Sequence, residues 1–291
     1  MFRRPRLLGA VALVAALSAC GAASPRAAAP SRSAFLDPGV VHVHGLGVDP
    51  ADGVLYAATH YGVFRIPETG PATRVADRFQ NTMGFTVVGP RTLLGSGHPD
   101  LGKDPDLPPR LGLIRSADAA QTWQRVSLSG KVDFHALRAA HGNVYGWDSG
   151  TGDLMVSGDD GRTWDTRSQL QLSDLAVSPT DPNVLLAATG KGLVRSADGG
   201  RTSTPEPTAL PLAVLAWPDE QSLFGVAADG DVMQSPDGGR TWARRGSAGG
   251  QPEALAVEVR GGALTVFVAV ADRGILASTD GGRTFTTRYG Q

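Results

Sequence analysis

The stretch Ser235–Trp242, SPDGGRTW, decides the fold, because four related stretches occur elsewhere in the chain at a nearly constant spacing. Successive copies start 41, 39, 39 and 43 residues apart. The five copies begin at Ser116, Ser157, Ser196, Ser235 and Ser278. A period near 40 residues is typical of repeat proteins, in which each repeat forms one small unit of secondary structure.

Each copy has the composition of a tight turn followed by a strand. The aspartate carboxylate, Asp237 in this copy, can accept hydrogen bonds from backbone N–H groups of the turn, and the glycines after it permit a positive φ. The Trp or Phe that closes four of the five copies is expected to begin a strand and to pack into the core.

Between the turns, the repeats predict four short antiparallel strands. In residues 169–207 the expected strands are Leu172–Ser178, Val184–Thr189 and Gly192–Ser196, followed by a fourth beyond the turn. The same order begins at His44, although the turn of that repeat has lost most of the shared residues. Short strands with frequent turns are typical of β-propellers. We therefore predict an all-β, six-bladed propeller over residues 37–291, with blades at 37–80, 81–129, 130–168, 169–207, 208–248 and 249–291.

The pattern S-x-D-x-G-x-T-W resembles the Asp-box, or BNR repeat, of sialidases and other β-propellers. Over residues 37–291 the chain is similar to Asp-box propeller lipoproteins that are catalogued as glycosyl hydrolase-like. The resemblance implies a sialidase-type propeller fold. It leaves the activity open, because Asp-boxes recur in enzymes and in pure binding proteins.

A sialidase-like glycoside hydrolase acting on glycans is the enzymatic alternative. The stretch Phe64–Pro67, FRIP, matches the sialidase motif that carries a substrate-binding arginine, but its register places Arg65 in the third strand of its blade, away from the axis. The aligned inner-strand positions contain no Arg or Tyr, both of which a sialidase needs. A general pair of carboxylates, Glu253 with Asp133 or Asp148, would come from blades that are not adjacent. No catalytic residue is therefore predicted.

The first 20 residues have the features of a lipoprotein signal peptide. MFRRPR is basic, Leu7–Leu17 is an apolar run too short to span a bilayer stably, and the sequence ending at Cys20, LSAC, resembles the bacterial lipobox. Cys20 is the only cysteine and the expected lipidation site, so no disulfide can form within the chain. Residues 21–36 are expected to form a flexible linker. These features predict a cell-envelope protein that is lipid-anchored to the membrane on the extracytoplasmic side.

The overall charge is balanced. The chain carries 27 Lys and Arg residues against 28 Asp and Glu, which gives a formal net charge of −1. This balance provides no general field that would attract nucleic acid. We therefore expect no nucleic-acid partner, and we expect a monomer.

Histidine positions give the most informative pattern for function. When the inner strands are aligned on their apolar residues, His44, Met83, His135 and Glu253 fall at equivalent positions in four consecutive blades. Second-strand ends return to the same rim, because neighbouring strands are antiparallel. Five of the six histidines are therefore expected at one mouth of the axial channel, and His141 at the other. The predicted site residues are His42, His44, His60, Met83, His98, His135 and Glu253.

This set of donors predicts a metal site. Imidazoles from adjacent blades could each meet a metal at about 2 Å. Imidazole combined with the thioether of Met83 favours copper, whereas histidine with carboxylate alone would suit zinc or iron. Asp133 or Asn81 could accept hydrogen bonds from the ring N–H groups of the ligands.

Two further alternatives remain open. The mouth could bind a small polar ligand without any metal. The insertion Pro99–Arg110, between the second and third strands of blade 2, could instead bind another envelope protein, because long loops on a rigid scaffold often carry function.

Overall fold

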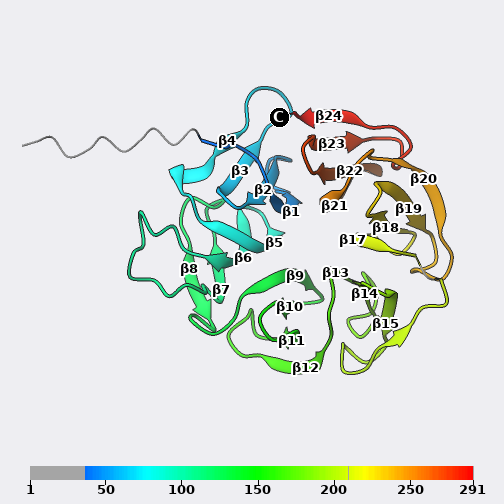
Figure 1. Cartoon of the computed structure of the whole chain (residues 1–291), viewed down its shortest axis with the longest axis horizontal. Helices are drawn as coiled ribbons and strands as arrows, with labels where there is room; N and C mark the ends of the chain where they lie inside the picture. Colours follow the sequence, from blue (N-terminus) through cyan, green and yellow to red (C-terminus); the bar gives the residue numbers. More distant parts are fainter. Residues whose placement is uncertain (1–36, 209, 291) are drawn as a thin grey trace, which may run out of the picture. The chain divides into compact units, whose positions relative to one another are not determined.

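A computed structural model describes residues 37–208 and 210–290. They form six four-stranded antiparallel sheets, and the strands of every sheet are neighbours in sequence (Figure 1). The prediction of an all-β, six-bladed propeller is confirmed. The predicted signal peptide, Cys20 and the linker at 21–36 lie outside the described residues and stay predictions.

The first three blades contain the insertion and all six histidines. Blade 1 consists of β1 (Val43–Val48), β2 (Leu55–Thr59), β3 (Gly62–Ile66) and β4 (Thr73–Arg74), followed by the short 3₁₀ helix η1 (Val75–Asp77). Blade 2 consists of β5 (Asn81–Gly89), β6 (Thr92–His98), β7 (Leu113–Ser116) and β8 (Gln124–Ser127). Blade 3 consists of β9 (Phe134–Ala140), β10 (Asn143–Asp148), β11 (Asp153–Ser157) and β12 (Asp165–Gln169).

The last three blades complete the ring. Blade 4 consists of β13 (Asp174–Val177), β14 (Leu185–Thr189), β15 (Gly192–Ser196) and β16 (Thr204–Pro205). Blade 5 consists of β17 (Leu212–Asp219), β18 (Ser222–Ala227), β19 (Asp231–Ser235) and β20 (Ala243–Ser247). Blade 6 consists of β21 (Pro252–Arg260), β22 (Ala263–Val270), β23 (Gly274–Ser278) and β24 (Thr286–Tyr289).

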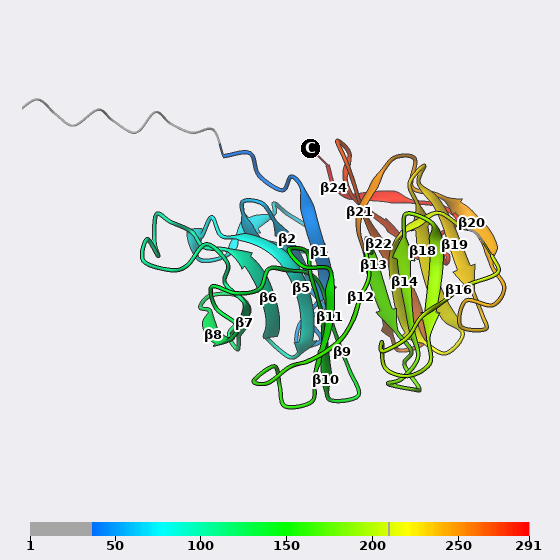
Figure 2. The ribbon, with the colours of Figure 1, turned by 60° about the horizontal axis from the view of Figure 1, so that its bottom comes forward.

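Burial decreases from the inner strands to the outer strand of each blade, as the strand sequences become more polar. The first strands surround the axis in Figures 1 and 2, and the second strands are almost completely buried between neighbouring blades. β2, with the sequence LYAAT, is buried at every residue, whereas the outer strand β12, DTRSQ, is largely exposed. Continuous apolar runs therefore become inner and second strands, and polar runs become the outer edge.

The hydrophobic core is divided among the blade interfaces. Six clusters of buried residues occur in the described part of the chain, and each combines residues of two adjacent blades. The aromatic residue that closes a repeated turn packs against the preceding blade, as Trp242 of blade 5 does against the cluster containing Leu186 of blade 4. Each blade therefore needs its neighbours to bury its apolar faces.

The repeated turns have closely similar hydrogen bonds. In blade 5, Asp237 Oδ1 accepts the Thr241 N–H at 2.8 Å and Oδ2 accepts the Thr241 hydroxyl at 2.7 Å. Ser235 Oγ donates to Asp237 Oδ1 at 2.8 Å and accepts the Gly239 N–H at 2.7 Å. The same four bonds occur in the other four copies. Gly239 has a φ of +93°, and a Cβ there would lie 2.8 Å from Leu186 Cδ1. The turn therefore lies directly against the previous blade.

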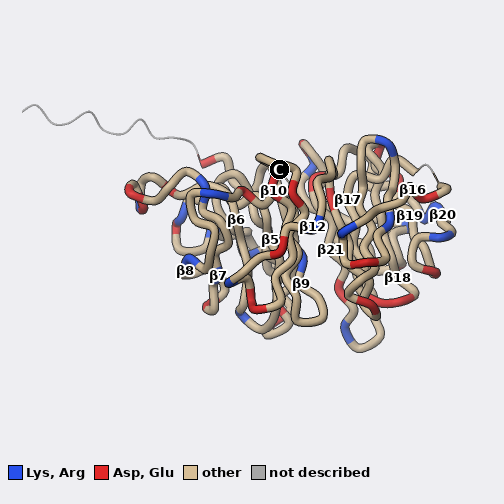
Figure 3. Tube along the Cα trace, turned by 90° about the horizontal axis from the view of Figure 1, so that it is seen from below, with Lys and Arg blue, Asp and Glu red and all other residues tan. Residues whose placement is uncertain are grey.

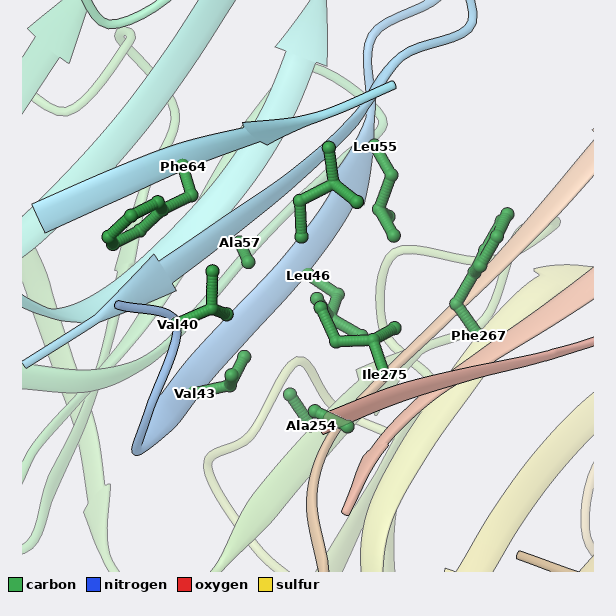
Figure 4. Packing of buried hydrophobic residues seen from close by; sticks show 11 residues of the cluster. Val40, Val43, Leu46, Leu55, Ala57, Phe64, Ala254, Phe267 and Ile275 are labelled. Atoms are coloured by element: carbon green, nitrogen blue, oxygen red, sulfur yellow. The ribbon is translucent and has the colours of Figure 1, made fainter. Parts of the chain in front are cut away.

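The ring closes without exchanging a strand between its first and last blades. The closing interface, which we call the seam, is an apolar cluster that joins Val40, Val43 and Leu46 to Phe267 and Ile275 (Figure 4). Hydrogen bonds across it include the Val43 N–H to Glu253 Oε2 at 3.1 Å and Arg288 to the Ile66 carbonyl at 3.3 Å. Side-chain packing, rather than a shared sheet, holds the seam.

Charged residues of both signs are interspersed over the propeller (Figure 3), as the balanced composition indicates. In the part of the chain with described coordinates, no helix combines the length and apolar character needed to cross a membrane.

Candidate functional site: the mouth of the axial cavity

A cavity of about 700 Å³ lies among the inner strands of the ring. Its apolar wall includes Leu46, Phe85 and Leu255. Its polar lining consists mainly of His44, His135, Arg138, Ser173, Asp174 and Glu253. This volume and mixed lining fit a binding site for an ion or small molecule.

Bulges in the inner strands set the direction of the predicted site residues. The pairing of β1 with β2 shifts register between Val43 and Gly45, so that His44 is the extra residue. Equivalent shifts occur at His135 and Glu253, and a wider one in β5 includes Met83. These bulges were not predicted from the sequence. The glycines that follow His44 and Met83 were the available signal, because glycine within a strand often marks a bulge.

His42, His44 and His60, which we call the blade 1 cluster, lie together. His44 Nε2 is 2.8 Å from His60 Nδ1, and the ring centroids of His42 and His60 are 5.6 Å apart. Burial, followed by the positive charges of His60, His135 and His42, lowers the pKa of His44 to about 4. His44 is therefore a neutral imidazole near pH 7, which is the form that coordinates metals.

His98, Asp133 and His135, which we call the blade 2–3 cluster, form the second group. Asp133 Oδ2 lies 3.1 Å from His135 Nε2 and 3.4 Å from His98 Nε2. The Nδ1–H of His98 donates to the Pro109 carbonyl at 2.7 Å. Burial alone would raise the pKa of Asp133, but the hydrogen bond from His135 and the nearby positive charges lower it overall.

Glu253 and Met83 are less available than the sequence analysis expected. Glu253 Oε2 accepts the Val43 N–H across the seam, and Oε1 lies 3.9 Å from His42 Nδ1. Met83 is half-buried and is not one of the residues that line the axial cavity. Glu253 therefore has a clear structural role at the seam.

His141 lies just beyond the opposite end of β9 from His135, as the sequence analysis expected. Its Nε2 is 2.8 Å from the Ser178 carbonyl oxygen, and it lines a separate cavity of about 430 Å³. It therefore provides a histidine control outside the mouth.

The sequence analysis missed the ion pair of Arg138 and Asp174 in the cavity wall. Arg138 donates to Asp174 Oδ1 at 2.5 Å, and Asp174 also accepts the Leu175 and Leu215 N–H groups at 2.8 Å each. Burial raises the pKa of Asp174, and the Arg138 charge opposes that shift. A charged residue within the apolar run SDLAV was the signal, because a buried charge is normally paired.

The insertion at 99–110 extends between β6 and β7 (Figure 1) and is anchored at both ends. Asp100 Oδ2 accepts the Phe79 N–H at 2.8 Å, and Arg78 forms an ion pair with Asp104. Leu101 remains 65% exposed. Because Pro109 contacts His98, the end of the insertion forms part of the mouth.

The mouth contains the donors for a metal without a fully assembled site. Among residues 37–208 and 210–290, no group of three or more His, Cys, Asp or Glu side chains already converges on one point suited to an ion. Donors at about 2.0–2.1 Å around a tetrahedral ion are about 3.3–3.4 Å from each other. The 2.8 Å separation of His44 Nε2 and His60 Nδ1 must therefore widen before both could hold one ion.

Comparison with other proteins identifies the fold. No family model matches the chain, and no curated protein matches it. Solved structures similar to it include a GH74 enzyme from Niastella koreensis, with a TM-score of 0.55 and 16% identity over 82% of this chain and 36% of that chain. A GH74 xyloglucanase from Xanthomonas campestris has a TM-score of 0.55 and 17% identity over 84% of this chain and 45% of that chain.

A third similar structure is YCF48 bound to D1 peptide. It has a TM-score of 0.53 and 15% identity, and the match covers 86% of this chain and 82% of that chain. The match covers less than half the length of each of the two GH74 structures. At these identities the similarities establish the propeller fold alone.

Proposed function

We propose that the protein is an extracytoplasmic binding protein, lipid-anchored through Cys20, that takes up a transition-metal ion at its histidine-lined mouth, with copper as the favoured ion. The observation that carries the proposal is the gathering of five of the six histidines at one mouth, from β1, β6, β9 and the residues beside β1 and β2. The blade 1 and blade 2–3 clusters are each held by short contacts.

The chemistry of the blade 1 cluster supports this proposal. His44 is neutral near pH 7, and its Nε2 shares a hydrogen bond with His60. Imidazole nitrogen suits copper, zinc, nickel and iron, and copper forms the most stable complexes among these divalent ions. If the two rings moved slightly apart, a metal ion could take the place of the proton between the two nitrogens.

Hydrolysis of glycans has less support. The three carboxylates considered for it are all engaged: Glu253 with the Val43 N–H, Asp133 with His135, and Asp148 with the Asp133 N–H. A docking role would use the insertion, where Leu101 is exposed. That the similar YCF48 structure contains a bound peptide keeps this role as an alternative for the propeller face.

Calorimetric titration of the metal-free, full-length protein with Cu(II) or Zn(II), and with Cu(I) under anaerobic conditions, tests the proposal. We expect uptake of copper by the wild type and by His141→Ala. For His44→Ala/His60→Ala we expect a loss of copper affinity greater than the roughly 10–100-fold that outer-shell partners of a metal site cost. A folded wild-type protein that takes up none of these ions near neutral pH would refute the proposal, and the metal-free polar pocket would replace it.

A further inference from the structure

We infer that the mouth contains a discrete cation subsite at the boundary of blades 2 and 3, formed by His98 Nε2, His135 Nε2 and the Asp133 carboxylate, with Asn81 Oδ1 beside it. The inference rests on the proposed function and divides the mouth into two parts. The nitrogen and oxygen donors of this subsite suit a borderline divalent ion such as Zn(II) better than Cu(I).

The contact with the insertion fixes which nitrogen of His98 faces the subsite. The Pro109 carbonyl can only accept a hydrogen bond, so His98 Nδ1, 2.7 Å away, carries the proton. In the neutral ring Nε2 then presents a lone pair, which lies 3.4 Å from Asp133 Oδ2. Two acceptors facing each other at this distance favour a positive charge on or between them, from a proton or from a metal ion.

The separations fit an ion. Asp133 Oδ2 is 3.4 Å from His98 Nε2 and 3.1 Å from His135 Nε2. Ligands of a tetrahedral zinc ion are about 3.3–3.4 Å from each other. The donors of the blade 2–3 cluster therefore need smaller movements to surround an ion than the 2.8 Å pair of His44 and His60.

Among the described residues, two buried carboxylate or amide oxygens of blades 2 and 3 have no hydrogen-bond partner. They are Asp133 Oδ1 and Asn81 Oδ1, and the side chain of Asp133 is only 10% exposed. Asn81 is paired with His98 across β5 and β6, which places it at the same boundary. Buried acceptors in folded proteins are normally satisfied, and a cation would satisfy both of these oxygens.

Binding needs one proton to move. His135 Nε2 is placed to donate to Asp133 Oδ2, so before this nitrogen can coordinate, its proton must move to Nδ1 of the same ring or be released to solvent. This protonated arrangement explains why the donors do not already converge on one point. Arg110 also carries a positive charge near Asp133, and its guanidinium is engaged with the Lys131 carbonyl at 3.2 Å.

Zn(II) titration of the metal-free, full-length protein tests the subsite. The variants Asp133→Asn and His98→Ala alter it, His60→Ala alters only the blade 1 cluster, and His141→Ala is the matched control. We expect Asp133→Asn and His98→Ala each to weaken Zn(II) binding by about 100-fold or more. We expect His141→Ala to stay within about threefold of the wild type, and His60→Ala to weaken Zn(II) binding by less than Asp133→Asn does. Zn(II) should raise the melting temperature of His141→Ala and leave that of Asp133→Asn unchanged, by mass action on the folded state.

The outcomes separate the two proposals. Zn(II) binding that survives Asp133→Asn and His98→Ala but is lost in His60→Ala would overturn the subsite and leave the proposed function standing. Uptake of copper without uptake of Zn(II) would also overturn the subsite and leave the proposed function standing. A wild-type protein that takes up neither ion would overturn both. His98 is 42% exposed on its side chain, so His98→Ala is expected to fold even if Asp133→Asn does not.

Discussion

Replacing Arg138 with methionine should destabilise the propeller by breaking the buried ion pair of the cavity wall. Asp174 would keep its bonds from the Leu175 and Leu215 N–H groups but lose its counterion. Removing one partner of a buried pair costs about 3–5 kcal/mol. Because the Arg138 side chain is 28% exposed, we expect the lower part of that range or less, about 2–3 kcal/mol.

Thermal unfolding measures this change. For a domain of this size, each kcal/mol shifts the melting temperature by about 2–4 °C, so the expected decrease is about 4–12 °C at pH 7. The matched control is Arg162→Met, because Arg162 pairs with Asp160 at 3.3 Å and both side chains are more than two-thirds exposed. We expect the control to change the free energy of unfolding by less than about 0.5 kcal/mol.

The pH dependence provides a second check. Burial raises the pKa of Asp174, and Arg138 opposes that shift, so removal of Arg138 raises this pKa further. A carboxyl whose pKa is higher in the folded state binds protons more readily there, so folding gains stability as the pH falls. The difference in melting temperature between the wild type and Arg138→Met should therefore become smaller between pH 7 and pH 5. A variant within about 1–2 °C of the wild type, or a difference that widens on acidification, would show that the pair is not the stabilising contact described.

Three other predictions concern the turns and the anchor. Ser235→Ala leaves the buried Gly239 N–H without an acceptor and should cost about 1–3 kcal/mol in urea unfolding, with metal uptake unchanged; altered uptake would mean that the turn contacts the site. Hydrogen bonds from Thr241 lower the pKa of Asp237 to about 2, so its stabilisation is present above pH 4 and is lost as the pH falls through 2. Asp237→Asn should flatten that acid decline in melting temperature, and an unchanged decline would contradict this assignment. Cys20→Ala should abolish lipid labelling and release the protein from membranes, and unchanged membrane association would exclude the anchor.

The repeat was sufficient to predict the six blades, because one turn chemistry recurs with a period near 40 residues. It even placed blade 1, where the turn has lost most of the shared residues. The gathering of the histidines could also be predicted, because antiparallel strands return to the same rim. Which histidine pairs with which partner could not. The contacts of His98 with Pro109 and with Asp133 depend on the path of the insertion and on the bulge at His135.

The ion pair in the cavity wall is a second contact that the sequence could not predict. Arg138 and Asp174 are 36 residues apart and belong to neighbouring blades. Side-chain alternation within one strand gives no information about contacts between two separate sheets. Such contacts depend on how closely the sheets pack, which bulges and glycines adjust locally.

The seam has a consequence for the order in which the molecule is made. Each blade is a contiguous segment, so its strands can pair soon after they leave the ribosome, whereas the contact of Val43 with Glu253 spans 210 residues. Until blade 6 is synthesised, the apolar face of blade 1 that includes Val43 and Leu46 cannot pack against blade 6. An apolar face that stays exposed through most of translation is a site for aggregation and for chaperone binding. Ring closure, rather than the folding of any single blade, is therefore the step that buries this apolar face and ends the risk of misassembly.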